Sequence, residues 1–114
     1  MMSIEGLIQA QLAPLVTGRC YPLVAPDPSA KPYIVYQVIS DVQVNSLDGF
    51  SGLSNKRVQV DIYATSYGGS KTLASSAKTA MSNASFSNIH LSSQDLYEND
   101  TQLFRTSMDF SIWS

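Results

Sequence analysis

Apolar residues near the N-terminus recur every three or four positions, which is the spacing of one face of an α-helix. Ser3 can cap the first turn, and Pro14 ends or kinks the helix. The pattern predicts a first helix over about Ser3 to Ala13. Its apolar face would consist of Ile4, Leu7, Ile8, Leu12 and Leu15.

Two strands are predicted in the first half of the chain. The segment "YIVYQVIS", Tyr33 to Ser40, is rich in β-branched and aromatic residues and is apolar on both faces, which favours an internal strand. Residues 57–64 alternate with period two, so one face should be buried. The buried face would carry Val58, Val60, Ile62 and Ala64, and the polar face Arg57, Gln59, Asp61 and Tyr63. The four prolines from Pro22 to Pro32 leave room only for a short strand at Arg19–Tyr21.

A long loop is predicted between these two strands, over about Asn45 to Asn55. It is rich in Gly, Ser, Asp and Asn around a single aromatic residue, Phe50. Loops on a rigid scaffold often carry function, and an apolar ring on such a loop favours contact with a partner. The alternative is a solvent-exposed hairpin connection without a partner.

The second half predicts a helix followed by a hairpin. In "SYGGSKTLASSAKTAMSN", Gly68 and Gly69 break the preceding strand and Ser70 can cap the helix. Its apolar stripe would consist of Leu73, Ala77, Ala80 and Met81, with Ala74 beside them. A weaker strand follows from Ile89 to Tyr97. The last strand alternates clearly: Phe104, Thr106, Met108, Phe110 and Ile112 on one face against Arg105, Ser107, Asp109 and Ser111 on the other.

The order of helix, strands, helix and strands excludes a consecutive βαβ series. The fold class is therefore α+β, with a mainly antiparallel sheet of about four to five strands covered by two helices. A chain of 114 residues without internal repeats or a linker is expected to form a single domain over residues 1–114.

Charge and composition narrow the classes of partner. The net charge is -2, and residues 1–57 hold four basic and four acidic groups, so a basic face for nucleic acid is not expected. Charged residues make up only 14%, which leaves a neutral polar surface that is compatible with burial against other subunits. Cys20 is the only cysteine, which fits a reducing compartment. Because the sequence shows no signal peptide and no apolar run of about 20 residues, we expect a soluble protein made in the cytosol, without membrane contact.

Residues with catalytic or metal-binding chemistry are scattered. His90 is the only histidine, so no histidine cluster can bind a metal, and it is most simply a surface residue. Cys20 is most simply a small core residue, with a reactive thiol as the lesser alternative. Asp61 and Asp109 would occupy the polar faces of strands, where solvation or a cross-strand partner such as Arg57 or Arg105 explains them better than acid–base catalysis.

Neither the glycines nor the tyrosines form a recognisable binding motif. The glycines at 49, 52, 68 and 69 do not match a phosphate loop or a dinucleotide fingerprint. The six tyrosines lack the basic companions of a single-strand binding platform. No catalytic, cofactor or metal site is therefore predicted, and an enzyme is not expected.

Five short motifs together resemble the family of small phage tail-completion proteins, also called tail terminators, of tailed phages and prophages. They are "YPL" at 21–23, "PYIVYQ" at 32–37, "LDG" at 47–49, "SGL" at 51–53 and "RVQVD" at 57–61. The resemblance covers nearly the whole chain. Two departures stand out: Gly69 and Ser70 replace an alanine-rich helix start, and His90–Asn99 matches none of the motifs.

The resemblance implies a structural virion protein, made in the cytoplasm of a bacterial host and located in the virion tail. Its relatives form rings, commonly hexameric, that cap the head-proximal end of the tail tube, stop its elongation and join the head connector. The partners implied are other copies of the chain, the tail tube protein and the head–tail connector protein, with no specific nucleic acid and no cofactor. The alternatives are a connector or tube component of the same virion and, more distantly, a small soluble enzyme or binding domain.

The predicted interface combines the loop with the polar face of the following strand. Arg57 and Asp61 share that face, and they could serve either a subunit interface or an ion pair within the chain. The predicted interface residues are Leu47, Asp48, Gly49, Phe50, Leu53, Arg57 and Asp61.

Overall fold

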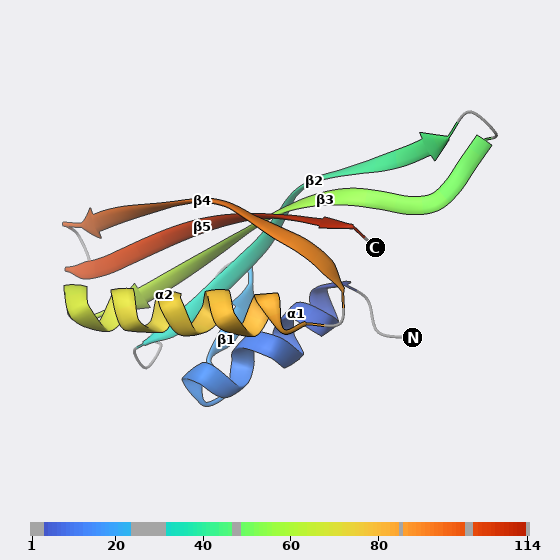
Figure 1. The fold of residues 1–114 in the computed structure, drawn as a ribbon. Helices are drawn as coiled ribbons and strands as arrows, with labels where there is room; N and C mark the ends of the chain where they lie inside the picture. The colour runs from blue at the N-terminus through green and yellow to red at the C-terminus, as the bar shows by residue number, and fades with distance from the viewer. Residues whose placement is uncertain (1–3, 24–31, 47–48, 85, 100–101, 114) are drawn as a thin grey trace.

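A computed structural model describes residues 4–23, 32–46, 49–84, 86–99 and 102–113. Helices and strands follow one another along the chain in the predicted order. The sheet has five strands, so the α+β class is confirmed (Figure 1). The elements are α1 (Ile4–Leu12), the 3-10 helix η1 (Ala13–Val16), β1 (Cys20–Pro22), β2 (Tyr33–Ser46), β3 (Gly49–Ala64), α2 (Tyr67–Ser82), β4 (Ser87–Glu98) and β5 (Leu103–Trp113).

The N-terminal segment folds as its apolar spacing predicts. Ile4, Ile8 and Leu12 are buried along one face of α1. Pro14 falls in the first turn of η1, where its missing N–H leaves no hydrogen bond unmade. Thr17 and Gly18 both have positive φ angles, 52° and 85°, and this reverses the chain into β1.

The sheet has the strand order β1-β2-β3-β5-β4. Only β1 and β2 run parallel among the described strands, and the other neighbours are antiparallel. β3 lies at the centre, between β2 and β5. β2 is internal as predicted only where β1 covers it, from Ile34 to Tyr36.

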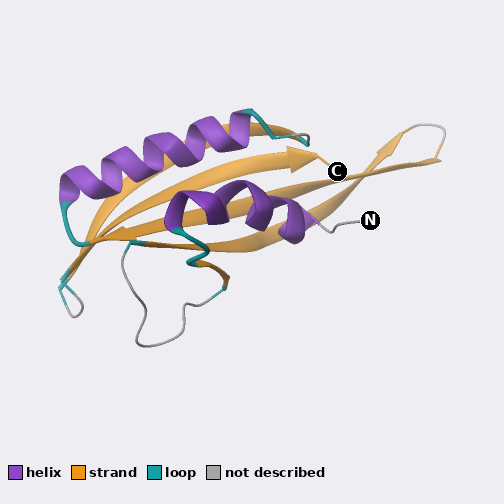
Figure 2. Cartoon of the chain, turned by 90° about the horizontal axis from the view of Figure 1, so that it is seen from below, coloured by secondary structure: helices purple, strands orange, loops and turns teal. Residues whose placement is uncertain are grey.

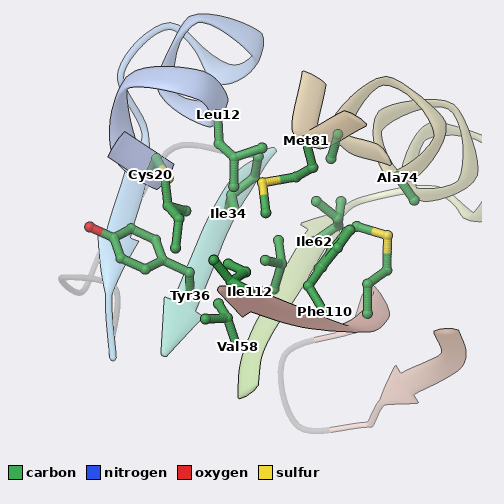
Figure 3. Close-up of a cluster of buried hydrophobic side chains, with 14 of the residues drawn as sticks. Leu12, Cys20, Ile34, Tyr36, Val58, Ile62, Ala74, Met81, Phe110 and Ile112 are labelled. Atoms are coloured by element: carbon green, nitrogen blue, oxygen red, sulfur yellow. The ribbon is translucent and has the colours of Figure 1, made fainter. Parts of the chain in front are cut away.

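Both helices cover the same face of the sheet and leave the other face bare (Figures 1 and 2). Between helices and sheet lies the core, in which Leu12 and Met81 point toward Ile34, Ile62 and Phe110 (Figure 3). The alternation predicted for the last strand is confirmed, because Thr106, Met108, Phe110 and Ile112 are all buried, and Phe104 on the same face is half-buried. The buried alternation of β3, from Val58 to Ala64, is confirmed as well.

The start of α2 differs from the prediction. Ser66, not Ser70, is the N-cap, and its hydroxyl accepts a hydrogen bond of 3.0 Å from the Gly69 N–H. Gly68 and Gly69 therefore lie in the first helical turn, and the buried Ser70 donates to the Tyr67 carbonyl. The residues that α2 buries are small apart from one: Ser70, Ala74, Ala77 and Met81.

The loop predicted over Asn45–Asn55 is wrong, because the chain there continues as two paired strands. β2 extends to Ser46 and β3 begins at Gly49, with a shift in register after Val44. Backbone pairing that begins in the regular part of a hairpin extends through Gly, Ser and Asn, which have low strand propensity but do not prevent it. Leu47 and Asp48 lie outside the described residues.

Candidate interaction surfaces

The outer part of the β2–β3 hairpin projects from the sheet as a two-stranded arm (Figure 1). We define the hairpin arm as residues 42–46 of β2 and 49–54 of β3. Pairing between β3 and β5 begins at Asn55 opposite Trp113, and β1 ends opposite Tyr36, so no third described strand flanks the arm. Two strands alone are marginally stable in water. A partner that adds contacts to this arm would therefore stabilise it.

Polar contacts anchor the base of the hairpin arm. The Asn55 amide donates to the Ser111 hydroxyl of β5 at 2.7 Å. Lys56 donates to the Ser54 hydroxyl at 2.6 Å and forms an ion pair of 3.9 Å with Asp41 on the opposite strand. These contacts connect the arm to the sheet at the point where the third strand ends.

The bare face of the sheet carries a buried ion pair at its centre. Asp61 accepts from the Arg105 guanidinium at 3.0 Å and, through both carboxylate oxygens, from the Gln59 amide at 3.1 Å. Although no helix covers this face, Asp61 is only 5% exposed, because neighbouring side chains enclose it. A second ion pair, Arg57–Asp109 at 3.6 Å, is more open to solvent. Of the two explanations that the sequence leaves open, the structure therefore favours a cross-strand arginine partner over solvation for both aspartates.

Electrostatics favour the charged form of Arg105. Burial by itself would lower the pKa of the guanidinium, but the adjacent Asp61 raises it above its ordinary value. The Nε of Arg105 is buried and has no hydrogen-bond partner in the described part of the chain. The guanidinium is held by Asp61 on one side and lies 5.7 Å from the ring centre of Tyr63.

A row of aromatic rings crosses the same face from β1 to β3. The ring centres of Tyr21 and Tyr33 are 6.4 Å apart, and Tyr33 stacks on Tyr63 at 4.8 Å. Burial raises the pKa of Tyr63 above its ordinary value, which further favours the protonated hydroxyl. The row and the ion pairs together give this face hydrogen-bonding groups held on a regular sheet.

The two residues considered for catalysis lie far apart in the sheet. Cys20 is on β1 and His90 on β4, the two outermost strands. Burial raises the pKa of the Cys20 thiol to about 12, which leaves it protonated and unreactive at neutral pH. His90 is exposed and lies beside the Phe110 ring, with centres 5.3 Å apart. The structure therefore does not bring Cys20 and His90 together as a nucleophile and base.

No cluster of three or more potential metal ligands occurs within the described residues. The helices described here are also too short or too polar to span a membrane. A pocket of about 230 Å³ opens where β1 ends beside β2. It is lined by Glu5, Pro22, Leu23, Tyr36, Gln37 and Val38.

The sequence matches the family of tail completion protein gp17 over residues 7–114. The chain belongs to this family. A chain from a structure titled "Virion of native gene transfer agent (GTA) particle" shares the fold, with a TM-score of 0.71 and 15% identity over 93% of this chain and 90% of that one. No curated protein matches the sequence. The resemblance carried by the five motifs is confirmed, and the protein is a structural component of the virion tail.

The residues predicted as interface fall into two groups in this tail completion protein. Gly49, Phe50 and Leu53 belong to the hairpin arm, whereas Arg57 and Asp61 lie on the bare face of β3. Arg57 and Asp61 do not pair with each other, because each has a partner on β5. The interface role of all seven residues stays a prediction.

Sequence reasoning did not find the aromatic row or the apolar residues on the outer strands. The tyrosines come together only through the register of three strands, which their sequence spacing does not reveal. No sequence signal marks β4 as an edge strand, because residues 87–98 contain no Lys, Arg or Pro. Those residues commonly protect the free edge of a sheet.

Proposed function

We propose that this protein caps the head-proximal end of the tail tube, stops the tube from elongating and provides the surface that joins the head connector. It acts as a ring of copies, hexameric as in the relatives that its motifs resemble. The observation that supports this most directly is the family match over residues 7–114. The projecting hairpin arm gives the proposal a structural element that can reach a neighbour.

The hairpin arm is the element that we assign to the joining contact. Both of its outer backbone edges lack a neighbouring strand in the described structure, so a partner strand can add to either edge through main-chain hydrogen bonds. Phe50 is its aromatic residue, and aromatic residues contribute disproportionately to binding energy at interfaces. Arg57 lies next to the arm's base and, at 46% side-chain exposure, presents its charge to solvent.

Shortening the arm tests this assignment. Residues 43–54 are replaced by Asn-Gly, so that Val42 and Asn55, which are opposite each other in the sheet, are joined by a tight turn. The shortened protein should still unfold cooperatively, because the removed part pairs with no third described strand. In an infection that depends on it, tail lengths should become abnormal under electron microscopy and the infectious titre should be lost.

Two single substitutions, one in the arm and one away from it, separate the role of the arm from damage to the fold. Phe50→Ala should lower the binding free energy of capping by about 1–3 kcal/mol at each contact that the arm makes. Because the ring repeats this contact, the losses add up around it. Tyr67→Ala removes an exposed aromatic ring on α2, away from the arm, and should leave tail length unchanged. Tails of normal length and full titre from both arm variants would refute the joining role of the arm.

A further inference from the structure

The sheet has two edges with free backbone groups. β4 is the last strand of the sheet, so its whole outer edge lacks a neighbouring strand in the described structure. On the other side, β1 pairs with β2 only as far as Tyr36, and no described strand lies beside β2 from Gln37 onward. Neither β4 nor β2 beyond Gln37 contains Lys, Arg or Pro. These edges therefore lack the lysines and prolines that commonly prevent strand addition, and their charged residues are the acidic Asp41, Asp95 and Glu98.

Exposed apolar side chains gather on the same two strands. Seven large hydrophobic residues are exposed in the described part of the chain, and five of them lie on β2 or β4, with exposed fractions between 46% and 60%. These five are Ile39 and Val42 on β2, and Ile89, Leu91 and Tyr97 on β4. Scattered exposure would need no explanation, but its concentration on two unprotected edges indicates contact surfaces.

Three of the exposed residues on the two edges lie at similar levels along the strands of the sheet. The register places Val38, Val58, Phe110 and His90 in one row across the sheet. β2 and β4 each have a bulge next to this row, and the inserted residues are Ile39 and Leu91. Ile39, Ile89 and Leu91 therefore lie within about one residue step of the same level, whereas Val42 lies in the row of Ser87.

The two edges also match in direction. Three successive antiparallel pairings, β2–β3, β3–β5 and β5–β4, make β4 run opposite to β2. A second copy placed beside the first in the same orientation would thus present its β2 antiparallel to β4, which continues the alternation of the sheet.

We propose that the β4 edge of one copy, at Ser87–Ser92, pairs antiparallel with the uncovered part of β2 of the next copy, at Gln37–Val42. This inference rests on the self-association proposed above and specifies its contact. Different surfaces meet in such a contact, so it is heterologous and can close into a ring. The occupant is a second copy because the matching edge, in height and direction, is on the same chain.

The pocket at the end of β1 can accept an apolar side chain from the neighbouring copy in the proposed β4–β2 pairing. Gln37 and Val38, which begin the uncovered part of β2, line it together with the exposed Leu23. Leu91 of the adjoining copy would lie at this level, because His90 and Ser92 are in the rows of Val38 and Gln37. Contact with this pocket would cover Leu23 and Leu91 at once.

Cysteine cross-linking between copies tests the pairing. Full-length Ile39→Cys and Leu91→Cys proteins are mixed at concentrations above tens of micromolar, alone and with tail tubes, and treated with a short bismaleimide. The native Cys20 is buried and should not react. We expect covalent dimers from the mixture. The matched control replaces Leu91→Cys with Ser76→Cys, on the exposed side of α2, and should give none.

A lysine substitution provides a second test that does not depend on cross-linker reach. Ile89→Lys puts a charge on the β4 edge and should raise the concentration needed for assembly about tenfold or more, measured by native mass spectrometry. Ser76→Lys adds the same charge on α2 and should leave that concentration unchanged.

The outcomes separate this contact from the proposed capping role. One result would be assemblies that form with no more cross-linking between Ile39→Cys and Leu91→Cys than in the control, and another would be that Ile89→Lys leaves them intact. These two results together would overturn edge pairing but would remain compatible with a ring. Cross-linking of Leu91→Cys to itself would overturn it in favour of a symmetric β4–β4 dimer. Wild-type protein that stays monomeric even with tail tubes would overturn the edge pairing and the self-association together.

Discussion

Two ion pairs on the bare face of the sheet have the same chemistry but different surroundings. Asp61 is enclosed and accepts from both Arg105 and Gln59, so its removal would leave the guanidinium without its main partner. Arg57 and Asp109 are 3.6 Å apart and are partly exposed, so water can replace either of them. Enclosure, rather than the number of charges, determines how much each pair contributes to stability.

Removing one partner of each pair should therefore give unequal results. Asp61→Ala should lower the free energy of unfolding by about 1–3 kcal/mol, less than for a fully buried pair because Arg105 retains some access to water. Arg57→Ala should cost under about 1 kcal/mol. Urea denaturation of both variants measures the difference. Equal losses would contradict the assignment of Asp61 as an enclosed partner.

The first turn of α2 shows how one cap depends on a glycine. A Cβ placed on Gly69 would lie 2.8 Å from the Ser66 Oγ, the atom that accepts the capping hydrogen bond. A Cβ on Gly68 would meet nothing within 4 Å. The two adjacent glycines therefore differ in role, since only Gly69 is needed for the cap.

Alanine at the two positions should have different consequences. Gly68→Ala should raise the free energy of unfolding by up to about 1 kcal/mol, because alanine loses less backbone entropy on folding. Gly69→Ala displaces the Ser66 hydroxyl and should lose about the same amount through the cap, so that it gains nothing. Thermal unfolding of the pair is the measurement, and a stabilised Gly69→Ala variant would show that the cap can rearrange.

Whether the sequence periodicity predicts an element depends on whether that element buries one face. The apolar spacing of α1 and the alternation of β5 record burial directly, so both could be predicted from the sequence. The hairpin arm pairs with no third described strand, and its Gly, Ser and Asn residues are typical of loops. The cap of α2 was misplaced because Ser66 and Ser70 are equally suitable by residue type, and only the close approach to Gly69 distinguishes them.

At the scale of the whole molecule, the surfaces left uncovered lie on the bare face of the sheet, its two edges and the hairpin arm. Arg57 and Asp61 could be placed on the bare face from their alternation, and their arginine–aspartate partners followed from the strand order. The free edges could not be predicted, because the strand order in space decides which strands are outermost. A molecule with these uncovered surfaces is suited to assembly with other copies.

Assembly should be visible in the mass of the complex. Native mass spectrometry of the purified protein mixed with tail tube protein should show a closed ring of fixed copy number, because heterologous contacts that close leave no free end. The protein alone can remain monomeric if ring closure needs the tube as a template. Monomers in both conditions, above tens of micromolar, would count against a ring.

The hairpin arm also bears on how fast the chain folds. Val38 and Val58 face each other in the sheet, yet the whole arm lies between them along the chain. The arm therefore raises the sequence separation of the pairings that build the core of β2 and β3, and folding rates fall as such separations grow. Each doubling of a closed loop adds about 0.6 kcal/mol to its entropic cost. The projection to which we assign the joining contact should thus slow the folding of the chain, and the chain with the shortened arm should refold faster than the complete one.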